Sequence, residues 1–251
     1  MDYDRTEIAA RYDAGRSYAP EVMQLWLTAI SRHLPTAQVR DVVDIGSGTG
    51  RYSQALASHF GARVTGVEPS ARMLSEARAK TAGGTTFLQG RAEDLPLPDG
   101  SADLAFLSMV FHHLADAPAA ARECRRVLRP SCHVVLRNGT AEQAGSYPHV
   151  RFFAGIRDVI AERLPSAMQV RAAFEGNGFE LAAHEIVVHP MAPSLTDLAA
   201  KFRHRVDSML VALADEVFEA GMARLMQHAE NAERDEPPVQ NVDLFVFRAL
   251  A

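Results

Sequence analysis

Short apolar runs and amphipathic stretches alternate along the chain from Asp41 to about Arg137. Five runs are rich in apolar, often β-branched residues: DVVDI, RVTGVE, TTFLQ, ADLAFLS and CHVVLR. Such runs are typical of strands buried in a parallel sheet. The stretches between them, such as RYSQALASHF and ARMLSEARAK, carry apolar residues at helical spacing. This alternation predicts an α/β fold in which helices cover both faces of a mostly parallel sheet.

Residues typical of helix ends support the same division into strands and helices. Ser70 and Asp116 stand where helix N-caps are expected, and Gly61 stands where a helix should stop. We expect one further helix, from Arg11 to Leu34, before the first strand.

The last hundred residues are less regular. They predict two helices (151–164 and 166–178), a sixth strand (179–190), two amphipathic helices (194–213 and 215–233) and a closing seventh strand from Val239. The chain then divides into an N-terminal helical lid (1–40), a core (41–190), a helical insertion or cap (191–238) and a terminal core strand (239–251).

Composition narrows the class of protein. The 251 residues, 47% hydrophobic, suit one sizeable globular domain, or one domain with a cap. A net charge of −5 argues against general nucleic-acid binding, which favours a basic face. Neither Cys124 nor Cys132 has metal-ligand spacing, and no metal site is expected. No apolar run reaches a membrane span and no signal-peptide core is visible, so a cytoplasmic location is the expectation.

A glycine-rich loop follows the first predicted strand. In the sequence VVDIGSGTG, Gly46, Gly48 and Gly50 alternate with small polar residues, and Asp44 precedes them by two positions. Glycine lets a backbone turn sharply and lets a ligand lie against bare peptide. The spacing differs from the G-x-G-x-x-G of dinucleotide folds, and an acid here would repel a phosphate but attract an ammonium group. The alternative is a structural turn in which Asp44 caps the backbone.

A second acid, Glu68, ends the second predicted strand about twenty residues later. A carboxylate at this place can accept hydrogen bonds from both hydroxyls of a ribose. The feature indicates a nucleoside without saying which one, and a solvated strand end is the alternative reading.

Four segments in order resemble the motifs of class I S-adenosylmethionine-dependent methyltransferases. They are VVDIGSGTG, VTGVEPSARML, GRAEDLPLPDGSADLAFLSMVFHHL and RECRRVLRP. The resemblance covers residues 1 to about 140 and is closest to the small-molecule branch (methyltransferase type 11) that contains the ubiquinone/menaquinone C-methyltransferases. It implies a Rossmann-like seven-stranded sheet and S-adenosyl-L-methionine as cofactor, with S-adenosyl-L-homocysteine as product. A small-molecule methyl acceptor is the implied partner.

The resemblance also implies roles for individual residues. The loop Gly46–Ser47–Gly48 to Gly50 would wrap the methionine part of the cofactor, Glu68 would hold the ribose, and Ser108 would lie near the methionyl group. The adenine would meet Ala92 with Arg91 or Glu93, and would pack on Pro69 and Met73. The N-terminal helix of similar enzymes folds over the cofactor, which places Tyr12, Arg16 and Tyr18 at the methionine carboxylate or the acceptor.

Candidate catalytic bases follow the fourth strand. His112 and His113 stand at the catalytic edge of the predicted sheet, where an imidazole can take a proton at neutral pH. The alternative is that they only shape the loop. A weakly acidic acceptor needs such a base, whereas the in-line displacement itself needs mainly positioning.

The segment KFRHR offers candidate acceptor contacts. Arg203 and His204 lie off the apolar stripe of their helix, and a guanidinium fork suits a carboxylate. A solvated charged face is the alternative for both. Phe152 is a candidate for the acceptor pocket or for the core.

Three functions remain in competition. A methyltransferase acting on a small molecule is favoured by the ordered motifs. A non-catalytic S-adenosylmethionine-binding sensor or partner protein is the alternative, and an NAD-dependent oxidoreductase is disfavoured by Asp44 and the glycine spacing. The sequence names neither the acceptor, nor the methylated atom, nor the oligomeric state.

Overall fold

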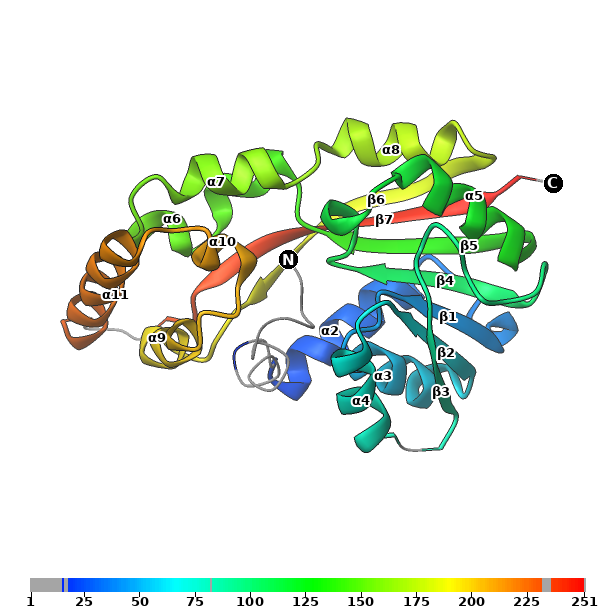
Figure 1. Cartoon of the computed structure of the whole chain (residues 1–251), viewed down its shortest axis with the longest axis horizontal. Helices are drawn as coiled ribbons and strands as arrows, with labels where there is room; N and C mark the ends of the chain where they lie inside the picture. Colours follow the sequence, from blue (N-terminus) through cyan, green and yellow to red (C-terminus); the bar gives the residue numbers. More distant parts are fainter. Residues whose placement is uncertain (1–14, 16–17, 82, 232–235, 251) are drawn as a thin grey trace.

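A single seven-stranded sheet forms the body of the molecule (Figure 1). The computed structural model describes residues 15, 18–81, 83–231 and 236–250. The strand order is β3-β2-β1-β4-β5-β7-β6. The strands are β1 (Asp41–Ile45), β2 (Arg63–Glu68), β3 (Thr85–Gln89), β4 (Ala102–Ser108), β5 (Leu128–Asn138), β6 (Phe179–Pro190) and β7 (Val239–Ala249).

All strands run parallel except the last. β7 inserts between β5 and β6 and pairs antiparallel with both. The predicted α/β fold, Rossmann-like and mostly parallel with seven strands, is confirmed. Strand order reverses where β1 lies between β2 and β4, so loops leaving β1 and β4 diverge and open a crevice at their carboxyl ends.

Helices cover both faces of the sheet, as expected. On one side lie α2 (Pro20–Ser31), α3 (Arg51–Phe60) and α4 (Ala71–Ala79), and on the other lie α5 (Ala117–Val127) and α8 (Ala167–Glu175) (Figure 1). An apolar core lies on each face of the sheet, and successive β1 residues point into different cores. Val42 packs with α2 and α3, whereas Val43 packs with α5 and α8. The capping signals hold, because the Ser70 hydroxyl accepts from the Met73 N–H and the Asp116 carboxylate accepts from the Ala119 N–H.

Three predicted helices are interrupted, each for a local reason. The helix expected over 11–34 is not continuous, because Tyr18 and Ala19 are not helical and α2 begins at Pro20, which lacks the N–H of a helix interior. The helix over 151–164 divides into α6 (His149–Phe152) and α7 (Ile156–Arg163) at Gly155, where φ is +71°.

The third interruption falls in the predicted helix over 194–213. It divides into α9 (Leu195–Arg203) and α10 (Ser208–Val211), because Arg205 takes a left-handed φ of +46° and Asp207 caps α10. The next helix, α11 (Asp215–Glu230), ends three residues short of the expected end.

The C-terminal helices build a separate apolar cluster at the far end of β6 and β7 (Figure 1). It joins residues of α9, α10 and α11 to residues of α6 and α7 and of the 3₁₀ turn before them (Ala141–Ser146). The apolar residues at helical spacing in the predicted helix over 194–213 are buried: Leu195, Leu198, Phe202, Val206, Met209 and Leu210. All of them except Val206 belong to this cluster. The division into lid, core, cap and terminal strand stays a prediction.

Candidate active site

A cavity of about 360 Å³ opens at the carboxyl ends of β1, β2, β4 and β5. This is the crevice beside the reversal of strand order, where open α/β sheets bind their ligands. Fourteen residues predicted for the site line it: Tyr18, Asp44, Gly46, Ser47, Gly48, Glu68, Pro69, Met73, Arg91, Ala92, Glu93, Ser108, His112 and His113.

The glycine loop turns in a way that other residues would strain. Gly46 has φ of +70°, and a Cβ there would lie 2.4 Å from the Val110 side chain. Gly48 has φ of +55°, and a Cβ there would meet nothing, so its bare backbone faces open space. Gly50, with φ of +77°, begins α3 and is crowded by Phe87; it supports the loop but does not line the cavity.

Asp44 is buried at the end of β1, with 2% of its surface exposed. Its Oδ2 accepts a hydrogen bond of 2.6 Å from the Ser53 hydroxyl. Burial raises the pKa of Asp44 from 3.8 to about 7; the Ser53 hydrogen bond opposes this, and the negative charge of Glu68 adds to it. No cationic side chain among the described residues pairs with this carboxylate. A cationic group in the cavity would therefore stabilise its ionised form.

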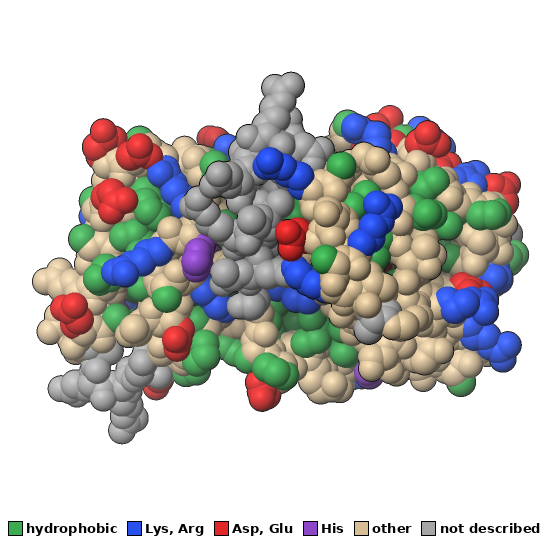
Figure 2. Space-filling view, turned by 60° about the horizontal axis from the view of Figure 1, so that its bottom comes forward, with side chains coloured by type: hydrophobic (Ala, Val, Ile, Leu, Met, Phe, Trp, Pro, Cys, Tyr) green, Lys and Arg blue, Asp and Glu red, His purple; other side chains and the backbone are tan. Residues whose placement is uncertain are grey.

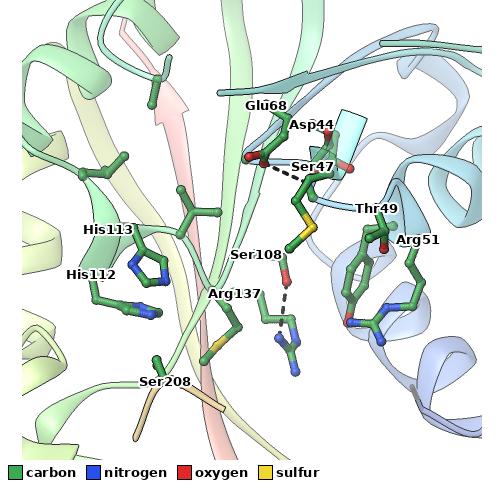
Figure 3. A pocket seen from close by; sticks show the side chains of 18 of the residues that line it. Asp44, Ser47, Thr49, Arg51, Glu68, Ser108, His112, His113, Arg137 and Ser208 are labelled. Carbon is green, nitrogen blue, oxygen red and sulfur yellow. Dashed lines mark hydrogen bonds between the residues drawn. The ribbon is translucent and has the colours of Figure 1, made fainter. Parts of the chain in front are cut away.

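Glu68 is fixed by two backbone donors. Its Oε2 accepts from the Gly48 N–H (Figure 3) and its Oε1 accepts from the Ser70 N–H, both at 3.0 Å. A carboxylate oxygen has two lone pairs, so a carboxylate held in this way can accept from ligand hydroxyls as well as from the backbone. The alternative of a freely solvated strand end does not hold, because only 6% of Glu68 is exposed.

The segment after β3 forms the next edge of the cavity. Glu93 Oε1 accepts from the Ala115 N–H at 2.9 Å, which ties this segment to the start of α5. Its Oε2 lies 3.6 Å from Arg91 Nε. An adenine amine needs an acceptor, which Glu93 has and Arg91 lacks. Met73 is buried on the same side of the cavity.

The chain leaves β4 through a strained turn. Met109 has a left-handed φ of +57°, and its N–H donates to the Arg137 carbonyl at 2.7 Å. The turn leads into a 3₁₀ segment, Phe111–His113, where the rings of His112 and His113 lie 4.0 Å apart between centroids. Figure 3 shows both imidazoles on the opposite side of the cavity from Asp44 and Ser47.

A scan against protein-family models matches residues 43–136 to a methyltransferase domain. Residues 43–136 are a class I S-adenosylmethionine-dependent methyltransferase domain.

The curated relatives of this methyltransferase domain are named for methylating different kinds of atom, oxygen in one case and carbon in another. The chain is 37% identical over 140 residues to a malonyl-[acyl-carrier protein] O-methyltransferase of Serratia marcescens, covering 55% of this chain and 52% of the relative. It is 33% identical to a ubiquinone/menaquinone biosynthesis C-methyltransferase of Rubrivivax gelatinosus, over 49% of each chain. The chain spans about half the length of these curated relatives.

A solved structure agrees with the methyltransferase fold over nearly its whole length. A protein of Anabaena variabilis, named as a methyltransferase from an antibiotic biosynthesis pathway, superposes with a TM-score of 0.71 and 22% identity. The match covers 94% of this chain and 99% of that one, and it supports the fold alone.

Some predicted site residues lie away from the cavity of the methyltransferase domain. Phe152 is buried in the apolar cluster of the C-terminal helices, and its carbonyl accepts from Arg224. Arg203 and His204 are exposed at the end of α9, outside the cavity lining. Tyr12 and Arg16 lie outside the described residues. Roles for these residues stay predictions.

Other lining residues were not found from the sequence. Some lie within or directly beside the motifs: Thr49, Arg51, Tyr52, Val67, Met109, Val110 and Leu114. The others come from parts of the chain distant from the cofactor motifs: Arg137, Tyr147, Asp207, Ser208, Met209 and Gln240. One signal was available for Arg137, since a charged residue ends the buried run CHVVLR at the same edge of the sheet as the glycine loop.

Three further features concern the surface charge, possible metal ligands and the length of the helices. On the face drawn in Figure 2, arginine and lysine side chains of the described residues are interspersed with aspartate and glutamate. Within the described ranges, no group of three or more His, Cys, Asp or Glu side chains is placed to hold a metal ion. No helix among the described residues is long and apolar enough to cross a membrane. The expectation of no nucleic-acid partner stays a prediction.

Proposed function

We propose that the protein transfers the methyl group of S-adenosylmethionine to a small-molecule acceptor by in-line displacement. The observation that carries the proposal is a pair of buried carboxylates, Asp44 and Glu68, beside a bare glycine backbone. Their chemistry fits an ammonium group and a ribose, and would repel a diphosphate. We call the lining around them the cofactor wall: Asp44, Gly46–Thr49, Glu68, Pro69, Met73 and Arg91–Glu93.

Different residues of the cofactor wall bind different parts of the cofactor. Glu68, already oriented by the Gly48 and Ser70 N–H groups, accepts from the ribose hydroxyls. Asp44 attracts the amino group of the methionine part. Glu93 accepts from the adenine amine, and Met73 supplies an apolar face for the ring.

Bound S-adenosylmethionine supplies an activated methyl group: an acceptor lone pair forms the new bond to the methyl carbon, and the breaking carbon–sulfur bond leaves its electron pair on sulfur. The protein positions the two reactants and excludes water, which contributes about 7–11 kcal/mol in favourable cases. An acceptor that carries a proton on the attacking atom gives it to His112 or His113, which face the cavity after β4.

Space beyond the cofactor wall favours an enzyme over a cofactor-binding sensor. The cavity continues to residues from β5, β7, α10 and the end of the 3₁₀ turn Ala141–Ser146, which we call the acceptor wall: Arg137, Tyr147, Ser208, Met209 and Gln240. A protein that only sensed the cofactor would have no need of this further lining.

Calorimetry tests the proposal. The protein should bind S-adenosylhomocysteine and S-adenosylmethionine and should not bind NAD, and methyl-labelled S-adenosylmethionine should label an acceptor from a panel of carboxylic acids, phenols and amines. Tighter binding of NAD would overturn the assignment. Binding of S-adenosylhomocysteine without turnover on any acceptor class would favour the sensor.

A further inference from the structure

One buried cation in the acceptor wall has no carboxylate counter-ion among the described residues. Arg137 ends β5 with 1% of its surface exposed and lines the cavity. Its Nη1 donates to the Ser108 hydroxyl at 3.3 Å (Figure 3), and its Nη2 donates to the Tyr18 hydroxyl at 3.2 Å. Its Nε, also buried, has no hydrogen-bond partner among the described residues. Burying a guanidinium without a carboxylate is costly, so its retention calls for an explanation.

The third partner of Arg137 is a neutral imidazole. His189 of β6 lies with Nε2 at 3.4 Å from Arg137 Nη2 and with Nδ1 at 3.1 Å from the Pro190 carbonyl. The carbonyl can only accept, so Nδ1 carries the proton and Nε2 accepts from Arg137. Burial, and then the charge of Arg137, lower the pKa of His189 to about 3. His189 therefore orients the guanidinium without neutralising it.

The carboxylates that line the cavity are engaged elsewhere. Asp44 accepts from Ser53, and Glu68 accepts from two backbone N–H groups. Glu93 binds the start of α5, and Asp207 caps α10. None of them forms an ion pair with Arg137, and the described part of the chain supplies no other carboxylate partner to it.

Further positive charge surrounds the same place. The Tyr18 ring lies 5.6 Å from the Arg137 guanidinium carbon, 5.0 Å from that of Arg51 and 5.8 Å from Lys201 Nζ. Three cationic side chains therefore gather around one ring at this end of the cavity.

We propose that Arg137 binds a carboxylate of the methyl acceptor, so that the substrate is an organic acid anchored at the carboxyl end of β5. The inference rests on the proposed function. A planar guanidinium fork matches the two oxygens of a carboxylate. Its neutral neighbours Tyr18, Ser108 and His189 suit a single negative charge better than the double charge of a phosphate monoester.

The location sets this group where the methionyl end of the cofactor is expected to meet the acceptor wall. Ser108, expected near the methionyl group, is the register partner of Arg137 on β4 and β5, which is why the affinity for the cofactor product is measured in the same test. Arg137 is also bounded by Trp26, whose ring lies 4.4 Å from the guanidinium carbon. The indole and the neighbouring strands hold the fork in place, which reduces the ordering that binding requires.

Ligand-observed NMR on the protein saturated with S-adenosylhomocysteine tests the proposal. The probes are benzoate, phenylacetate and butyrate, each with its uncharged amide, and phenyl phosphate. At least one carboxylate should bind about tenfold more tightly than its amide, as expected for a charge-assisted hydrogen bond to a guanidinium. Arg137→Met should abolish this preference, while the Kd of S-adenosylhomocysteine changes by less than about threefold.

Each remaining outcome contradicts a specific part of the proposal. If no carboxylate binds better than its amide, the inference is wrong although the proposed function stands. If Arg137→Met weakens S-adenosylhomocysteine about tenfold or more, the guanidinium serves the cofactor. If phenyl phosphate is preferred to every carboxylate, the charge class is wrong. Failure of the unmodified protein to bind S-adenosylhomocysteine defeats the proposed function instead.

Arg137→Lys covers the case in which the methionine variant does not fold. It keeps the charge and loses the planar fork, so the carboxylate preference should fall but remain detectable. An unchanged preference in Arg137→Lys would overturn the role of the fork.

Discussion

The cofactor wall and the acceptor wall carry opposite buried charges. The first presents Asp44 and Glu68, both less than 10% exposed, and the second presents Arg137, 1% exposed. Neither Asp44 nor Arg137 has a partner of opposite sign among the described residues. A fold selected for stability alone would pair or remove such groups. We infer that each wall keeps the charge that its proposed ligand would neutralise: an ammonium on one side and a carboxylate on the other.

The largest expected effect tests the cofactor wall. Glu68→Ala removes two charge-assisted hydrogen bonds to the ribose, together worth about 3–6 kcal/mol, so S-adenosylhomocysteine should bind at least about 100-fold more weakly. Isothermal calorimetry measures the change. Glu180→Ala, which removes an exposed carboxylate of β6 that pairs with Arg248, is the matched control. Unchanged affinity in Glu68→Ala would remove the ribose assignment.

The two walls also differ in how far the sequence predicts them. Asp44, Gly46, Gly48 and Glu68 stand at fixed distances from the ends of β1 and β2, so a strand pattern and a local spacing are sufficient to place them. These four residues of the cofactor wall therefore follow from the same periodicity that predicts the sheet, whereas Pro69, Met73 and Arg91–Glu93 are predicted from the resemblance.

The acceptor wall is assembled from residues distant in sequence. Arg137, His189 and Gln240 come from β5, β6 and β7, and they meet because the antiparallel β7 inserts between the other two. No spacing in the sequence records that register. The acceptor side of the cavity is also shaped by breaks between helices. Such a break depends on the backbone conformation of a single residue, such as the left-handed Arg205. Amphipathic periodicity does not predict it.

The histidine pair lines the cavity outside both walls and should affect turnover rather than cofactor binding. Replacing both His112 and His113 by alanine should lower kcat by about 100-fold on an acceptor that must lose a proton, since a positioned base contributes about 10²–10⁴. Steady-state kinetics with the best acceptor of the panel measures this. The affinity for S-adenosylhomocysteine should stay within about threefold. Full activity of the double variant would exclude a histidine base in this loop.

A smaller effect follows from the pKa of Asp44. In the ligand-free protein it titrates at about 7, and only its ionised form attracts an ammonium group. The affinity for S-adenosylhomocysteine should therefore fall by about tenfold between pH 8 and pH 6, as the carboxylate becomes protonated. Asp44→Asn should bind weakly and without this pH dependence. A profile that keeps its slope in Asp44→Asn would assign the titration to another group.

The same group should influence stability in the opposite direction. The folded-state pKa of about 7 lies above the unfolded value of 3.8, so the stabilising contribution of the bound proton is present at low pH and is lost as pH rises through 7. Without ligand, Asp44→Asn should raise the free energy of unfolding at pH 8, by as much as about 4 kcal/mol, and leave it nearly unchanged at pH 4. Urea unfolding at the two pH values measures the difference. Destabilisation at pH 8 would show that the carboxylate itself supports the fold.

The smallest expected effect separates a ligand-binding arginine from a structural one. Arg126 of α5 pairs with Asp99 and Glu123 and donates to the Leu95 and Leu97 carbonyls, so Arg126→Met should cost about 1–3 kcal/mol of unfolding free energy. Arg137→Met removes a buried charge that has no carboxylate partner in the described part of the chain, and leaves a flexible apolar side chain against Trp26. The unfolding free energy of the ligand-free protein should therefore change by less than about 1 kcal/mol. Urea unfolding compares the two. If Arg137→Met lowers the unfolding free energy as much as Arg126→Met does, the fold needs this guanidinium. The charge of Arg137 would then be explained by stability, and only the cofactor wall would keep a charge for its ligand.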